Sequence, residues 1–110
     1  MYTYKAKLNR VVDGDTVNLT IDLGFRLSYT SNCRLAGINA PELSTDEGKK
    51  SKAELSLYLK EWLTQYSMVD HSLDIISTGL DKYGRPIVVI KLGNININDK
   101  MVEGGYATKY

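Results

Sequence analysis

An alternating segment near the start of the chain most constrains its fold. Apolar and polar side chains alternate through residues 16–23, which is the pattern of a half-buried strand. The apolar set of this segment is Val17, Leu19, Ile21 and Leu23. A second strand-favouring run covers residues 4–12, and Asp13-Gly14 follows it. Glycine beside aspartate supplies the positive φ that a two-residue hairpin turn needs. The sequence therefore predicts an antiparallel hairpin closed at Asp13-Gly14.

This turn carries a second carboxylate, because Asp15 follows Gly14. Two carboxylates held close together repel each other unless a proton or a cation compensates them. Asp13 and Asp15 are therefore a candidate oxygen-ligand site for a hard divalent metal. Thr16 is expected to form a local hydrogen bond. The pattern Asp-Gly-Asp also occurs in solvated turns, so the turn alone does not distinguish the two interpretations.

The sheet is predicted to continue after Gly24. Phe25, Leu27 and Tyr29 alternate again, a polar break is expected at residues 30–32, and a third strand follows. In that strand Arg34 is out of phase with its neighbours Cys33 and Leu35, so its side chain should point away from the core. Residues 37–42 should leave the sheet, because Pro41 lacks a backbone donor.

The chain has one long helical pattern. Residues 44–47 have the spacing of a capping box, with Ser44 as N-cap and Glu47 at the third position. The apolar stripe behind them consists of Leu55, Leu59, Trp62, Leu63 and Tyr66. Three lysines near the helix start are interpreted as a solvated face rather than a phosphate patch; they are Lys49, Lys50 and Lys52. The helix should pack on the sheet through its stripe.

The second half of the chain predicts two further strands and a short helix. His71 precedes a strand at residues 73–76 and is expected to be structural or exposed. Residues 81–86 form a turn-rich cluster, and the β-branched run 87–90 suggests a strand covered on both faces. Asn98 is predicted as an N-cap, with Ile97 and Val102 as a hydrophobic staple, and Gly104-Gly105 should end this helix before an unpaired tail. Together the elements predict a mainly β or α+β fold. They suggest a five-stranded Greek-key barrel of the OB type with one long helix and one or two short helices.

Length and composition limit the kinds of protein that this chain can be. With 110 residues, the chain is expected to form a single domain over 1–110. The 14 Lys and Arg residues nearly cancel the 13 Asp and Glu residues, so any anion binding must be local. The single cysteine, Cys33, excludes an internal disulfide and is expected to be a buried thiol. No apolar run is long enough to span a bilayer, so we expect a cytoplasmic protein without a membrane partner. The sequence leaves the oligomeric state open, and a monomer is the expectation.

Three separated segments carry unusual chemistry: residues 12–17, residues 34–42 and residues 81–85. They supply oxygen ligands for a cation, a carboxylate that could take a proton from water, and guanidinium groups that could neutralise phosphate charge. In order and spacing these segments resemble the staphylococcal (thermo)nuclease family. Residues 101–107 are similar to that family's segment as well, so the resemblance spans nearly all of the chain.

The resemblance implies an OB-fold barrel with three helices and a calcium-dependent nuclease. Such an enzyme cleaves single-stranded or frayed DNA and RNA and leaves 3′-phosphates. It also implies roles for residues of this chain. The implied calcium ligands are Asp15 directly, Asp13 mostly through water, Asn39, and the backbone carbonyl of Ala40. The implied catalytic residues are Glu42 as general base or water-positioning group, with Arg34 and Arg85 as phosphate clamps. The implied contacts to a terminal phosphate are Tyr83 and Lys82, although an aromatic residue there could equally serve packing.

Three departures from the family pattern accompany the resemblance. Asn39 occupies a position where the best-known members carry Asp, which removes a charge and should weaken metal binding. The connection from Glu42 to Gly48 is shorter than the loop of the secreted enzymes, and no long C-terminal helix follows Tyr110. These departures keep a second hypothesis open, a catalytically silent OB-type module that binds nucleic acid or a protein. The layout without a leader is closer to intracellular or phage-encoded members.

Overall fold

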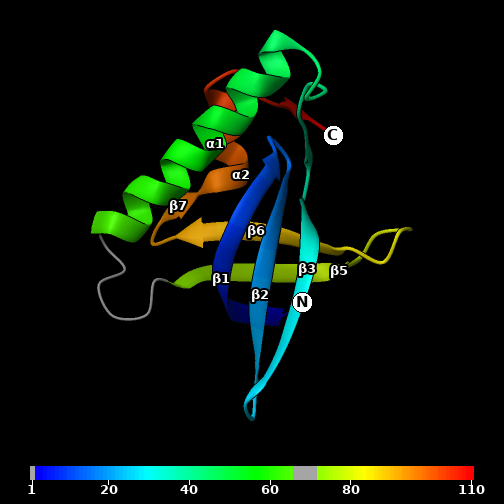
Figure 1. Cartoon of the computed structure of the whole chain (residues 1–110), viewed down its shortest axis with the longest axis vertical. Coiled ribbons are helices and arrows are strands. Elements are labelled where there is room, and N and C mark those ends of the chain that lie inside the picture. Colours follow the sequence, from blue (N-terminus) through cyan, green and yellow to red (C-terminus); the bar gives the residue numbers. More distant parts are fainter. Residues whose placement is uncertain (1, 66–71) are drawn as a thin grey trace.

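The protein is a closed β-barrel with two helices packed against it (Figure 1). The computed structural model describes residues 2–65 and 72–110. The barrel strands are β1 (Tyr2–Asp13), β2 (Thr16–Gly24), β3 (Leu27–Leu35), β5 (Ser72–Leu80) and β6 (Pro86–Leu92). The remaining elements are the short strands β4 (Ile38–Asn39), β7 (Ile95–Asn96) and β8 (Thr108–Lys109) and the helices α1 (Asp46–Gln65) and α2 (Ile97–Glu103).

The strand order is β3-β2-β1-β5-β6, and a pairing between β3 and β6 closes the barrel. All neighbouring pairs are antiparallel except this last one, which is parallel and joins Arg34 to Ile87 and Leu35 to Val88. A closed mixed barrel of five strands with two helices is an OB-type fold, so the predicted fold class is confirmed. The resemblance implied three helices, whereas the described part of the chain holds two.

The barrel interior is filled by the inward-facing apolar residues of every strand. The alternation predicted for the second strand is confirmed at Val17, Leu19 and Ile21, which are buried, but Leu23 is 45% exposed. Leu23 lies where the β2–β3 hairpin extends beyond the barrel, so no opposing layer covers it (Figure 1). Cys33 and Leu35 are buried and Arg34 is half-buried on the other face, as predicted.

The β2–β3 connection differs from the prediction. Phe25 and Arg26 both have positive φ and form the hairpin turn, so Phe25 is not part of a strand and is 98% exposed. The expected polar break at residues 30–32 is absent, because β3 runs without interruption from Leu27 to Leu35. The side chains of Thr30 and Asn32 form hydrogen bonds with Thr20 and Asn18 of β2, which removes the reason for a break.

Helix α1 packs on β1 and covers the barrel interior at one side (Figure 1). Leu55 and Leu59 are fully buried, and Trp62 and Leu63 pack against the core at its edge. The predicted cap is one residue too early: Thr45, not Ser44, accepts a hydrogen bond through its side chain, from the N–H of Gly48 at 3.0 Å. Tyr66 and His71 lie outside the described residues. Neither described helix has the length and apolarity of a membrane span.

The C-terminal segment contains two further differences. Asn96, not Asn98, caps α2, because its side chain accepts from the N–H of Asp99 at 3.0 Å. Gly104 ends the helix as predicted. The tail is not unpaired, because β8 pairs with β4 in a second, two-stranded sheet. Strand β6 is not covered on both faces either: its residues alternate between buried and half-buried, since only one face meets the barrel interior.

Candidate active site

The connection between β1 and β2 is a two-residue turn at Gly14-Asp15, because Asp13 and Thr16 are paired in register. The predicted turn was therefore one residue too early. The φ of Gly14 is not positive, so the backbone conformation does not require glycine here. The position requires glycine because a larger side chain would not fit. A Cβ at Gly14 would lie 1.8 Å from Ser51 Oγ and 2.9 Å from Ala40 Cβ. The glycine lets the turn pack closely against helix α1 and the segment after β4.

Asp15 is held at this turn by three groups. Its Oδ2 accepts from the backbone N–H of Ala40 at 2.8 Å and lies 3.3 Å from Arg34 Nη1. Its Oδ1 accepts from the Thr16 hydroxyl at 3.2 Å, which confirms the local role expected of Thr16. Asp13 Oδ1 in turn accepts from the Asp15 N–H at 3.0 Å. Asp15 is only 8% exposed, so its carboxylate is a fixed group at the edge of the barrel.

The pKa of Asp15 is raised above its ordinary value. Burial is the largest cause, and the carboxyl of Asp13 adds to it through a shared hydrogen bond and through its charge. The Ala40 N–H and the guanidinium of Arg34 act in the opposite direction. Two carboxyl groups this close, in a partly desolvated position, favour either a shared proton or a cation.

Arg34 connects the turn to the β4 segment. Its guanidinium donates to the backbone oxygens of Asp15 and Leu35, both at 3.3 Å, and to Asn39 Oδ1 at 3.2 Å. The backbone is fixed as well, because the N–H of Leu35 donates to the Asp15 carbonyl at 2.8 Å. The side chain is therefore anchored on one side and only 18% exposed. It is a preorganised cation beside the Asp15 carboxylate.

Arg85 is held by the loop that precedes β6. The Asp81 carboxylate accepts from Arg85 Nε at 2.7 Å and from the backbone N–H groups of Tyr83 and Arg85, both at 2.9 Å. Desolvation raises the pKa of Asp81, but these hydrogen bonds and the Arg85 charge outweigh it, so the net pKa is lowered. Because only Nε is engaged, the terminal Nη groups of Arg85 are free of this pair. The loop thus leaves both terminal nitrogens of Arg85 open to a ligand.

The two arginines face one groove because of how the barrel closes. The parallel pairing of Arg34 with Ile87 brings the end of β3 beside the start of β6, directly after Arg85. The groove has a volume of about 530 Å³. Its polar lining consists of Arg34, Asn39, Asp81, Lys82, Tyr83 and Arg85, and Tyr110 also contributes. The predicted clamps and substrate contacts are therefore brought together.

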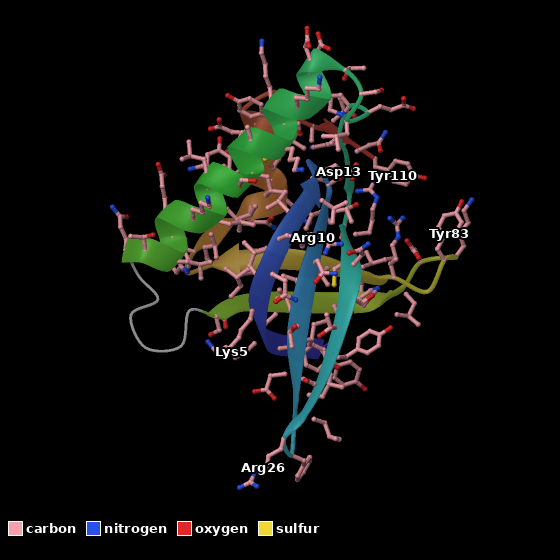
Figure 2. All side chains as sticks on the ribbon, in the orientation of Figure 1. Lys5, Arg10, Asp13, Arg26, Tyr83 and Tyr110 are labelled. Atoms are coloured by element: carbon pink, nitrogen blue, oxygen red, sulfur yellow. The ribbon has the colours of Figure 1, made fainter. Side chains whose placement is uncertain are left out.

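Tyr83 lies at the outer tip of this loop (Figure 2), and Lys82 precedes it in the chain. Tyr83 is 72% exposed, so it does not serve core packing. Lys82 Nζ lies 5.2 Å and Arg85 Cζ 5.6 Å from its centroid, which is within cation–π range. The ring and the two cations form a ready contact surface for an anionic, planar ligand.

Glu42 is not brought into this groove. It is exposed, and within residues 2–65 and 72–110 its carboxylate has no hydrogen bond or ion pair. Its backbone is nevertheless fixed, because its carbonyl accepts from Thr45 through both the N–H and the hydroxyl. A Cβ at Gly48 would lie 1.9 Å from the same carbonyl, so the start of α1 packs tightly on it. Glu42 lies two residues after Ala40, whose N–H donates to Asp15 Oδ2.

The donor set fits a hard divalent cation. The candidate ligands Asp13, Asp15, Asn39 and the Ala40 backbone supply only oxygen atoms, which calcium and magnesium prefer. The two close carboxyls also have an electrostatic need for a cation. No group of three or more His, Cys, Asp or Glu side chains is gathered anywhere in the described part of the chain. The binding of a cation here would therefore rely on few charged side chains and on water molecules as further ligands.

Sequence reasoning missed three residues that support the site: Asp81, Ser51 and Asn98. Asp81 was seen only as part of a turn, although an Asp before a Gly-containing loop often binds the loop's own backbone. Ser51 looks like any helical serine, and its contact with Gly14 depends on tertiary packing. Asn98 was taken for a cap, but it is buried and its Nδ2 donates to the carbonyls of Ala36 and Val88. Asn98 thus joins β6 to Ala36, two residues after Arg34, and acts as a clasp between the two segments.

Comparison with known proteins identifies the family of the chain. The model of the family described as staphylococcal nuclease homologue matches residues 32–110. Endonuclease YhcR of Bacillus subtilis (strain 168) is 33% identical over 97% of this chain, which covers 9% of that protein. Uncharacterized protein MJ1439 of Methanocaldococcus jannaschii is 27% identical over 97% of this chain and 59% of that protein. The chain thus spans less than two thirds of either relative. With the family model matching most of its length, the chain belongs to the staphylococcal nuclease homologue family.

Proposed function

We propose that this protein is a calcium-dependent nuclease that hydrolyses phosphodiester bonds of single-stranded DNA or RNA. The observation that carries the proposal is the pair Arg34 and Arg85, which line one groove, with Arg34 Nη1 3.3 Å from the Asp15 carboxylate. A phosphodiester in that groove would meet two guanidinium groups, each already held by a carboxylate. Membership in the nuclease homologue family and the relative named as an endonuclease support the same reaction class.

The proposed roles of the residues rest on their positions and, for Glu42, on the family resemblance. Arg34 and Arg85 would bind the scissile phosphate and neutralise the negative charge that develops on its oxygens. Both are anchored, so little conformational entropy would be lost when they engage substrate. Tyr83 and Lys82 at the loop tip would hold a neighbouring phosphate or base. Glu42 would position or deprotonate the attacking water from the rim.

Asp15, Asp13, Asn39 and the Ala40 backbone would hold the metal ion. When bound, a calcium ion in this place would supply positive charge to the phosphate and help to orient the attacking water. Asp15 would be the main ligand, because it is the most firmly held carboxylate of the set. Asn39 contributes an oxygen without charge, which would keep the affinity moderate.

A second function has one observation in its favour. The Glu42 carboxylate is exposed and is not among the residues that line the groove with the arginines. A protein without a positioned base could bind nucleic acid in the groove and leave it intact. This is the OB-type binding module already considered as the alternative.

A nuclease assay on single-stranded DNA with calcium, magnesium, manganese or chelator separates these functions. Release of nucleotides only with calcium, lost in Glu42→Gln and reduced in Arg34→Lys and Arg85→Lys, is the expected result. The lysine variants keep the charge but cannot reproduce the two-pronged contact. An unchanged rate in Arg34→Ala would remove Arg34 from the mechanism. Oligonucleotide that is bound in calcium but stays intact would favour the binding module.

A further inference from the structure

We propose that the tip of the β2–β3 hairpin of one copy of this chain docks into a groove between α1, β7 and α2 of a second copy. The hairpin tip is defined here as residues 23–27, with Phe25 and Arg26 at its turn. The groove is called the α1–β7 groove, and it shares no lining residue with the groove of the two arginines. This self-association is independent of the proposed nuclease function.

The hairpin tip is an apolar and cationic projection. Phe25 is 98% exposed, and Leu23 and Leu27 on either side of the turn are 45% and 62% exposed. Arg26 is exposed as well, and within residues 2–65 and 72–110 it forms no ion pair. Figure 2 shows Arg26 at the end of the hairpin, beyond the barrel. Neighbouring exposed apolar side chains of this kind are typical of a surface that contacts another molecule.

The turn holds Phe25 and Arg26 in an unfavourable conformation. Gly24 is paired with Leu27, so Phe25 and Arg26 form a two-residue turn, and their φ angles are 54° and 63°. A turn with positive φ at both central residues favours Asn-Gly, whereas a residue as bulky as Phe rarely adopts this conformation. Backbone strain that a different local sequence would relieve points to a role for the two side chains.

The α1–β7 groove has the size and the lining for one aromatic ring. Its volume is about 190 Å³. An apolar cavity of about 150 Å³ is large enough for benzene. The apolar part of its lining consists of Trp62, Leu92, Ile95 and Ile97. Leu92 and Ile97 belong to the core, whereas Ile95 is 43% exposed, so the groove presents apolar surface to solvent.

Charge selects the groove, rather than a second hairpin tip, as the partner of the tip. Two tips in contact would place one Arg26 beside another. Glu61 lines the groove, and among the residues that the structure describes it forms no ion pair. Lys100 Nζ lies 5.0 Å from the centroid of the Tyr58 ring, so this cation is engaged within its own chain. Arg26 beside a docked Phe25 would therefore meet an unpaired carboxylate. The net charge of +1 causes little repulsion between copies.

One copy cannot fill its own groove with its own hairpin. Figure 1 shows the β2–β3 hairpin tip at the bottom, whereas β7 and α2 lie beside α1 at the left. Contact between tip and groove therefore needs a second copy and uses two different surfaces. Such a head-to-tail contact repeats into an open chain or closes into a ring. Docking does not occupy the groove of Arg34 and Arg85, because the two grooves have no lining residue in common.

The test is sedimentation velocity at increasing protein concentration. The tip variant is Phe25→Asn/Arg26→Gly, which carries the residues that this turn prefers and should melt at the same or a higher temperature. The groove variants are Glu61→Arg and Glu61→Arg/Ile95→Arg. The matched control is Leu80→Asn, which removes an apolar side chain that is 66% exposed at the end of β5, outside both surfaces. Thermal melting of each variant verifies that it is folded.

We expect the wild type and the Leu80→Asn control to associate with the same Kd, about 0.1 mM, because one ring and one ion pair form a small interface. The tip variant should stay monomeric although its fold is not weakened. Glu61→Arg should raise the Kd about tenfold, because it places two like charges together. A wild type that stays monomeric at every concentration, or a tip variant that associates like the wild type, would overturn the proposal.

A mixture of two variants identifies the two surfaces. The tip variant keeps an intact groove, and the double groove variant keeps an intact tip, so their mixture can form one contact and no more. We expect each variant alone to be a monomer and the mixture to contain a dimer of one copy of each, without larger species. Tip-to-tip association would leave this mixture without the dimer and would let the groove variant associate by itself. Either of these results would overturn the docking of tip into groove.

Discussion

Gly14 and Ser51 are in such close contact that the turn carrying Asp15 rests on helix α1. A Cβ at Gly14 would lie 1.8 Å from Ser51 Oγ and 2.7 Å from Ser51 Cβ. The Ser51 hydroxyl is fully buried and has no hydrogen-bond partner among the described residues. An unpaired buried hydroxyl costs stability, so the small volume of serine is the property that this position needs. The position of the turn that carries Asp15 is thus set by its contact with helix α1.

We predict that Gly14→Ala lowers nuclease activity roughly 100-fold, because a small misplacement of a catalytic group has such effects. It should also lower the free energy of unfolding by about 1–3 kcal/mol through overpacking. Urea unfolding and initial rates measure the two effects. Ser51→Gly in the same chain should restore part of the activity, while Ser51→Ala alone should leave stability equal or slightly higher. Independent, additive effects of Gly14→Ala and Ser51→Gly would contradict the contact.

Asp81 is predicted to be a positioning residue for Arg85. In Asp81→Asn, the remaining oxygen can still accept from the Tyr83 and Arg85 N–H groups, but the pair with Arg85 Nε is lost. We expect kcat to fall about tenfold with little change in KM, since the guanidinium is less well held. Asp81→Ala, which also releases the loop, should be worse. In an Arg85→Lys background, Asp81→Asn should add little; a full additional loss there would show a role independent of Arg85.

The barrel was predictable because its signals are local. Alternation at Val17, Leu19 and Ile21 and the out-of-phase Arg34 follow from the two-residue period of a strand, and each is confirmed. The turn residues were placed one position too early at Asp13-Gly14 and at Ser44. In both cases several adjacent residues could fill the same role, and tertiary contacts decide among them. Local propensity cannot resolve a shift of one residue.

The geometry of the site was less predictable, because it depends on how the barrel closes. The meeting of Arg34 and Arg85 follows from the parallel register of Arg34 with Ile87, which no sequence pattern indicates. The close approach of Gly14 to Ser51 likewise needs the helix in place. The resemblance supplied the candidate residues, and the fold shows which of them share a groove. Glu42 is the one candidate catalytic residue that the fold leaves outside it.

Asn39→Asp should strengthen calcium binding if Asn39 is a ligand. The amide oxygen of Asn39 now accepts from Arg34 at 3.2 Å, and a carboxylate would add charge to the set containing Asp15. Because calcium affinity follows ligand charge, we expect a roughly tenfold lower Kd by titration calorimetry. The matched control is Asn94→Asp, which adds the same charge at an exposed turn. Equal Kd values for Asn39→Asp and the control would exclude Asn39 from the coordination sphere.

Cys33 gives a prediction about pH. Burial raises the pKa of its thiol from 9.0 to about 11 in the folded protein. A group whose folded pKa is raised contributes stability that is complete below the unfolded value and is lost as pH rises through the folded value. Between pH 9 and 11 the free energy of unfolding should therefore fall by about 2–3 kcal/mol from this group. Cys33→Ala should lack this component in urea titrations at both pH values; an identical pH dependence would show that the thiolate is tolerated.

The two asparagines at the start of α2 give the sharpest test of the fold around Arg34. Asn98 Oδ1 accepts from the Ile90 N–H at 3.2 Å, and its Nδ2 donates to Ala36 and Val88. Asn98→Ala leaves these buried backbone groups short of partners, so we expect a loss of about 2–5 kcal/mol in the free energy of unfolding. Asn96→Ala removes only the helix cap and should cost about 1 kcal/mol.

The variants of Asn98 and Asn96 also distinguish a residue that joins two segments from a residue that only caps a helix. Ala36 follows Arg34 by two residues, so loosening its carbonyl should also disturb the guanidinium and raise KM for single-stranded DNA. Asn96→Ala leaves that segment untouched and should keep the wild-type KM. Both variants are compared by urea unfolding and by initial rates at several substrate concentrations. If Asn96→Ala proves the more damaging of the two in both measurements, then Asn98 is not the clasp that joins β6 to the segment after Arg34.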